Sequence, residues 1–95
     1  MGERQTSEAD LPGADLVRKG IADLERGEES VEAFLVSIGA PRLARLGIVV
    51  RSPLRSPEHG LYAVLARDEG DDAHSRYNAL VRRLVSFERA AECVR

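Results

Sequence analysis

Apolar residues recur along this chain at the spacing of an α-helix in four separate segments. The first segment covers residues 14–26 and is followed by Gly27, and the second begins after Ser30, a favourable N-cap, and ends at Gly39. Gly20 lies inside the first apolar stripe, where a glycine costs about 1 kcal/mol relative to alanine. We therefore expect Gly20 to mark a close crossing between two helices.

The middle of the chain has weaker periodicity and more turn-forming residues. Pro41 opens a short helical turn over 42–46, and an extended run of branched apolar residues follows at 48–50. A third helix is predicted over 57–68, because Ser56 can act as its N-cap and a proline stands at its first position.

The sequence Arg-Ser-Pro occurs twice in this region, at 51–53 and 55–57. A proline disfavours helical geometry in the residue before it, so both serines are expected to be extended. Paired Ser-Pro units can be modification or docking motifs, but a loop followed by a helix cap explains the same residues.

The strongest periodicity is at the end of the chain, where a helix should begin near Asp71 or Asp72 and run to about Cys93. Its apolar stripe comprises Tyr77, Leu80, Val81, Leu84, Phe87 and Ala91. Glu88 falls within this apolar arc, and an unpaired buried carboxylate is costly. We therefore predict that Glu88 pairs with an arginine from another helix or subunit, with Arg18 or Arg45 as the best candidates.

These segments predict an all-α protein, a small compact bundle of four main helices plus one short helical turn, with the longest helix at the C-terminus. Residues 1–12 are polar and are expected to form a flexible lead-in, and residues 13–95 a single helical domain. A chain of 95 residues buries a limited share of its surface, so the broad stripe on 77–91 favours a partner helix and a homodimer.

Composition excludes several classes of protein. Hydrophobic residues make up 43% of the chain and charged residues 32%, and no apolar stretch approaches the roughly 20 residues of a membrane span. The N-terminus lacks the apolar core of a secretory signal, so a cytoplasmic location is expected. Cys93 is the only cysteine, and the two histidines have no ligand spacing typical of a metal site. We expect no disulfide, metal or cofactor.

The net charge of −2 argues against a general nucleic-acid binder, but the charge is unevenly distributed. Residues 33–57 contain four arginines and no acidic residue. These residues, Arg42, Arg45, Arg51 and Arg55, form a candidate polar contact strip for an acidic partner or a phosphate.

The segment from Arg67 to Tyr77 resembles the signature of HEPN helical ribonucleases, in which an arginine and a histidine are separated by polar residues near a helix start. The resemblance covers eleven residues and implies metal-independent cleavage of RNA. Arg67 would hold the scissile phosphate, His74 would act as general acid or base, and Tyr77 would lie beside them. Four acidic residues lie between Arg67 and His74, and their negative charge would repel an RNA phosphate.

A helix-turn-helix over 31–46 would leave barely two turns for its recognition helix, because Pro41 and Gly47 bound it. We therefore expect a non-catalytic interaction or oligomerisation module, a homodimer or the binder of a protein partner through helical faces. A nucleic-acid-directed protein, either a HEPN-like ribonuclease or a phosphate-contacting binder, is the alternative.

Overall fold

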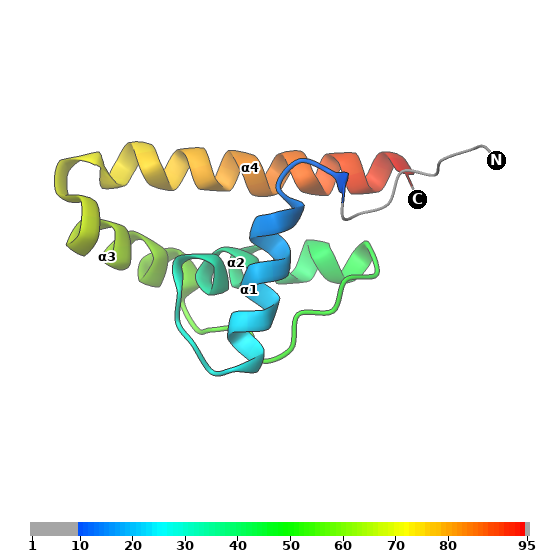
Figure 1. Ribbon diagram of the computed structural model, residues 1–95, viewed down its shortest axis with the longest axis horizontal. Coiled ribbons are helices and arrows are strands. Elements are labelled where there is room, and N and C mark those ends of the chain that lie inside the picture. Colours follow the sequence, from blue (N-terminus) through cyan, green and yellow to red (C-terminus); the bar gives the residue numbers. More distant parts are fainter. Residues whose placement is uncertain (1–9, 95) are drawn as a thin grey trace.

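A long C-terminal helix lies along one side of the molecule, and three shorter helices pack against one flank of it (Figure 1). The computed structural model describes residues 10–94. Its elements are α1 (Ala14–Glu25), α2 (Val31–Arg45), α3 (Pro57–Glu69), the 3-10 turn η2 (Gly70–Asp72) and α4 (Ala73–Val94). No strand occurs between residues 10 and 94, so the all-α fold and the position of the longest helix are confirmed.

Three of the four predicted helices begin and end within two residues of their expected positions: α1, α3 and α4. The N-cap prediction for α2 is also confirmed, because the side chain of Ser30 accepts a hydrogen bond from the backbone N–H of Ala33 at 3.0 Å. Most of the predicted flexible lead-in, residues 1–9, lies outside the described part of the chain.

The prediction that α2 ends at Gly39 is wrong, because this helix continues through Gly39 and Pro41 to Arg45. The predicted short turn at 42–46 is in fact the last turn of α2, and the separate short turn is η2. Pro41 removes only one backbone donor from the helix. Gly39 is buried, and a Cβ there would lie 3.0 Å from a methyl group of Leu84, so the glycine permits close packing of α4.

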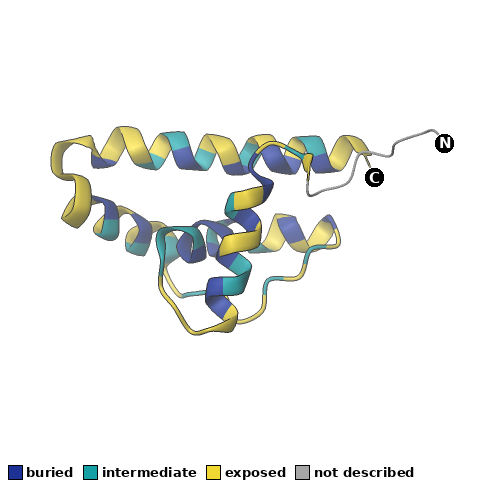
Figure 2. Cartoon of the chain, viewed as in Figure 1, coloured by how far each residue is buried: buried dark blue, intermediate teal, exposed yellow. Residues whose placement is uncertain are grey.

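The core is centred on α2, whose Leu35, Val36 and Leu43 are completely buried. The apolar side of α4 packs towards it: Leu80, Leu84, Phe87 and Ala91 are each at most 3% exposed. Figure 2 shows that buried positions of α4 lie on the side of the helix that faces the other helices. The stripe that suggested a partner helix is therefore covered largely by the chain itself.

At Gly20 the backbone of α1 lies very close to α2. A Cβ built on this residue would lie 2.3 Å from the backbone oxygen of Glu32 and 2.7 Å from Cγ1 of Val36. Both distances are well below ordinary van der Waals contact, which is about 3.5 Å or more between carbon atoms. The predicted close crossing at Gly20 is thus confirmed.

The junction between α1 and α2 is organised by Asp23, whose side chain is completely buried. Lys19 donates to its carboxylate at 2.7 Å, the hydroxyl of Ser30 donates at 2.5 Å, and Arg26 provides a further ion pair. The hydrogen bond from Lys19, followed by that from Ser30, lowers the pKa of Asp23 despite its burial. The same Ser30 hydroxyl therefore caps α2 and ties it to α1.

Candidate functional site

The four arginines of the predicted contact strip have different roles in the structure. Arg42 lies in the last turn of α2 and pairs with two carboxylates of α4, at 3.9 Å from Glu88 and 3.2 Å from Glu92. It is therefore committed to holding α2 and α4 together. Arg45 is exposed and also has an interaction within the protein.

Glu88 is 4% exposed, so its predicted burial and its pairing with an arginine from another helix are both confirmed. The arginine found in the ion pair is Arg42, whereas Arg18 or Arg45 was expected. Arg42 reaches α4 because α2 continues past Pro41 instead of ending before it. Burial raises the pKa of Glu88, and the guanidinium of Arg42 only partly opposes this shift.

Arg51 and Arg55 lie in the connection between α2 and α3, which spans residues 46–56. Both side chains are exposed, and neither forms an ion pair or hydrogen bond with any residue between 10 and 94. These two arginines are thus the members of the predicted strip whose charge remains uncompensated by the protein.

The prediction of extended geometry for the two serines before proline is wrong. Ser52 and Ser56 have positive φ angles of 54° and 46°. Ser56 stands at the N-cap position of α3, but its side chain makes no capping hydrogen bond. The chain reverses at these serines so that Leu54, between them, packs against the core and donates its backbone N–H to the Ser37 hydroxyl at 2.9 Å.

An open hollow of about 480 Å³ lies beside this connection. The ring of Phe34 and the side chain of Leu54 give it an apolar wall, and Arg55 and His59 stand at its polar side. The remaining lining residues are Glu29, Pro53, Ser56 and Gly60. The connection from 46 to 56 therefore combines an apolar recess with unpaired positive charge.

Val49 adds an exposed apolar side chain to this surface. It is 66% exposed, more than any other large hydrophobic residue between positions 10 and 94. Its neighbours Ile48 and Val50 are partly buried and pack against the core. The extended run was visible in the sequence, but nothing in the spacing alone indicated which of its three side chains would face water.

The residues of the ribonuclease hypothesis lie around the junction of α3, η2 and α4. Arg67 is exposed and pairs with the adjacent Asp68 at 3.1 Å, and His74 contacts the side chain of Asn78 at 3.3 Å. Tyr77 packs against Tyr62 with the ring centroids 6.1 Å apart. Burial and the carboxylate of Glu58 raise the pKa of Tyr77. Each of the three side chains of this hypothesis therefore contacts a residue that is not one of the other two.

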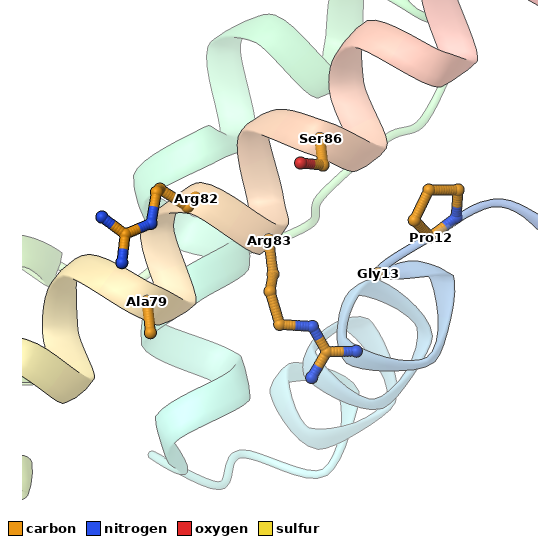
Figure 3. A pocket seen from close by; sticks show the side chains of 6 residues that line it. All are labelled: Pro12, Gly13, Ala79, Arg82, Arg83 and Ser86. Carbon is orange, nitrogen blue, oxygen red and sulfur yellow. The ribbon is translucent and has the colours of Figure 1, made fainter.

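A second hollow, of about 410 Å³, lies where the N-terminal end of α1 meets α4 (Figure 3). Arg83 extends from α4 towards α1 (Figure 3), and its guanidinium lies 3.5 Å from the carboxylate of Asp15, which the figure does not draw. Arg82, Ser86, Ala79, Gly13 and Pro12 complete the lining. This hollow could not be predicted from the sequence, because residues far apart in the chain form it. Arg83, the arginine that points towards α1, is already paired with the carboxylate of Asp15.

Residues 10–94 contain no group of three or more metal-ligating side chains, and Cys93 is exposed and forms no disulfide. None of the described helices is both long and apolar enough to cross a bilayer. Comparisons with models of protein families, with curated proteins and with solved structures found no match.

Proposed function

We propose that this protein is a non-catalytic interaction module that binds a protein partner through the connection between α2 and α3. The observation that carries this proposal is the uncompensated charge of Arg51 and Arg55 beside the exposed side chain of Val49. Arginine is enriched at protein contact surfaces, and the apolar groups that become buried there supply affinity.

The partner we propose is a different protein. Our expectation of a homodimer depended on the apolar stripe of α4, and Leu84 and Phe87 at its centre are 3% and 2% exposed. A second copy would have to displace the parts of the chain that pack against them, which include Gly39 of α2 beside Leu84 and Gly13 beside Phe87. Light scattering on the purified protein tests this part of the proposal directly, and a concentration-independent monomer is the expected result.

Affinity capture from a lysate of the source cells tests the proposal. The bait would be compared with its double variant Arg51→Glu/Arg55→Glu. The matched control is Arg82→Glu/Arg89→Glu, because both of these arginines of α4 are exposed and have no ion-pair partner in the described chain.

We expect that some proteins are retained both by the wild type and by Arg82→Glu/Arg89→Glu. The same proteins should be lost from Arg51→Glu/Arg55→Glu. It would be contradicted by equal retention on all three baits. Circular dichroism of each variant establishes that the helical fold is intact.

A further inference from the structure

The segment from Ile48 to Arg51 has no helix, strand or turn assigned to it, and only the first of its backbone donors is paired within the described chain. The N–H of Ile48 donates to the carbonyl of Leu43 at 2.9 Å, and the next backbone donor with a partner is that of Leu54. The N–H groups of the intervening Val49, Val50 and Arg51 have no hydrogen-bond partner in the described chain. Unpaired extended backbone is the feature that edge strands use to accept another strand.

The side chains of this segment alternate as they do in a strand that covers a core. Ile48 and Val50 are partly buried and pack against the core, whereas Val49 and Arg51 are exposed. A strand added beside the segment would therefore place alternate side chains next to Val49 and Arg51 on the outer face.

The charge around the segment favours an acidic partner over a second copy of this chain. Within 33–57, a stretch without acidic residues, Arg51 and Arg55 have no ion-pair partner in the described chain. Pairing this segment with itself would bring the uncompensated Arg51 and Arg55 of two copies close together, which is unfavourable. A strand carrying carboxylates would instead place opposite charges across the pair.

We infer that Ile48–Arg51 accepts, as an added β-strand, an extended acidic segment of the partner protein, with a branched apolar side chain against Val49 and a carboxylate against Arg51. This inference rests on the function proposed above and names the chemistry of the partner. Backbone hydrogen bonds would supply affinity, and the alternating outer side chains would supply specificity.

The probe is a synthetic peptide in which glutamate and valine alternate on one face of the strand and threonine occupies the other face. It is added to the ¹⁵N-labelled full chain while the backbone amide resonances are followed by NMR. We expect saturable shifts at residues 48–52 and at Arg55. We expect no comparable shifts in α4.

Two control peptides separate the two sources of affinity. Lysine in place of glutamate keeps the strand and reverses the charge, and methylation of alternate backbone nitrogens keeps the charge and removes the strand donors. Each change should weaken binding by roughly tenfold or more. If both control peptides bind as well as the parent, the inference is overturned.

Two matched pairs of variants locate the surface. Arg51→Glu should weaken binding of the acidic peptide by roughly threefold to tenfold, and Arg89→Glu, at an exposed arginine of α4, should leave binding unchanged. Val49→Ser should also weaken binding of the peptide, and Val94→Ser, at the other exposed valine, should leave it unchanged.

The outcomes also separate this inference from the proposed function. No peptide binding, together with a lysate partner that still depends on Arg51 and Arg55, would overturn the acidic strand and leave the interaction module standing. A lysate partner that ignores both arginines would overturn the proposed function itself. Peptide shifts confined to the α2–α3 connection and lost in Arg51→Glu would support the inference.

Discussion

Substitution of Gly20 by alanine tests the packing of α1 on α2 with a single methyl group. In an isolated helix this change is favourable by about 1 kcal/mol, because alanine has the higher helix propensity. In the structure the new Cβ would lie 2.3 Å from the carbonyl oxygen of Glu32 and 2.7 Å from Cγ1 of Val36. The backbone oxygen belongs to a helix and cannot move away as a flexible side chain could.

The expected magnitude follows from the movement that the methyl group requires. To restore an ordinary carbon–oxygen contact of roughly 3.3 Å, α1 and α2 must separate by about 1 Å. Overpacking costs roughly 1–3 kcal/mol, and the upper part of this range, roughly 2–3 kcal/mol, is expected here because the nearest atom is a backbone oxygen within a helix. After the gain in helix propensity is subtracted, Gly20→Ala should lower the free energy of unfolding by about 1–2 kcal/mol. For a domain of this size, that corresponds to a decrease in Tm of about 5–15 °C.

Thermal unfolding followed by circular dichroism measures this change, with Ala63→Gly as the calibrating variant. Ala63 is an exposed residue of α3, so its replacement should report helix propensity alone, a loss of about 1 kcal/mol. A Tm for Gly20→Ala at or above that of the wild type would refute the close crossing, because helix propensity would then be the dominant effect.

Four further predictions test other parts of the structure. The pKa of Asp23 is lowered in the folded state, so the wild type should be more stable than Asp23→Asn above about pH 4, and this advantage should disappear as the pH falls through the folded pKa in acid-titrated thermal melts. The pKa of Glu88 is raised, so its ionisation opposes folding; Glu88→Gln should raise the free energy of unfolding at pH 7 by roughly 1 kcal/mol, and the difference should vanish below about pH 4 in urea titrations. Leu84→Glu should unfold the chain at a cost of roughly 4 kcal/mol or more, seen as loss of helical circular dichroism, because Leu84 is 3% exposed. Purified wild-type protein and His74→Ala should show the same absence of RNA cleavage; activity that depends on His74 would contradict the proposed non-catalytic function.

The controls for these predictions are simple. Glu92→Gln, at an exposed carboxylate of the same helix, should not reproduce the pH-dependent stabilisation expected of Glu88→Gln. If Leu84→Glu remained a folded monomer while the wild type was a dimer, the result would support a dimer interface on α4.

Most of the fold could be predicted because local signals and the apolar stripes agree. Ser30 caps α2 as expected, and Pro57 stands at the start of α3. The end of α2 could not be predicted, because Gly39 and Pro41 commonly stop helices when only local preferences are considered. In the protein Gly39 is a packing position against α4, and the favourable contacts of Leu43 in the core hold the helix together beyond the proline.

The candidate site was predictable only in part. The local excess of arginine was apparent from the sequence. Which of these arginines pair within the protein and which do not was not apparent, because the pairing of Arg42 with Glu88 depends on the unexpected length of α2. The exposure of Val49 and the unpaired backbone beside it depend on how the connection crosses the core. Such non-local features are set by tertiary packing, which a short stretch of sequence does not encode.

A photo-reactive amino acid placed at position 49 in source cells tests the central claim, that the α2–α3 connection is the contact surface for a partner protein. The same amino acid at Ser86 provides the matched control, because Ser86 lines the hollow between α1 and α4, which shares no lining residue with the hollow beside the connection. We expect a cross-linked protein from position 49 that disappears when Arg51→Glu is added and does not form from position 86. Cross-linking that is equal from both positions, or absent from position 49, would contradict it.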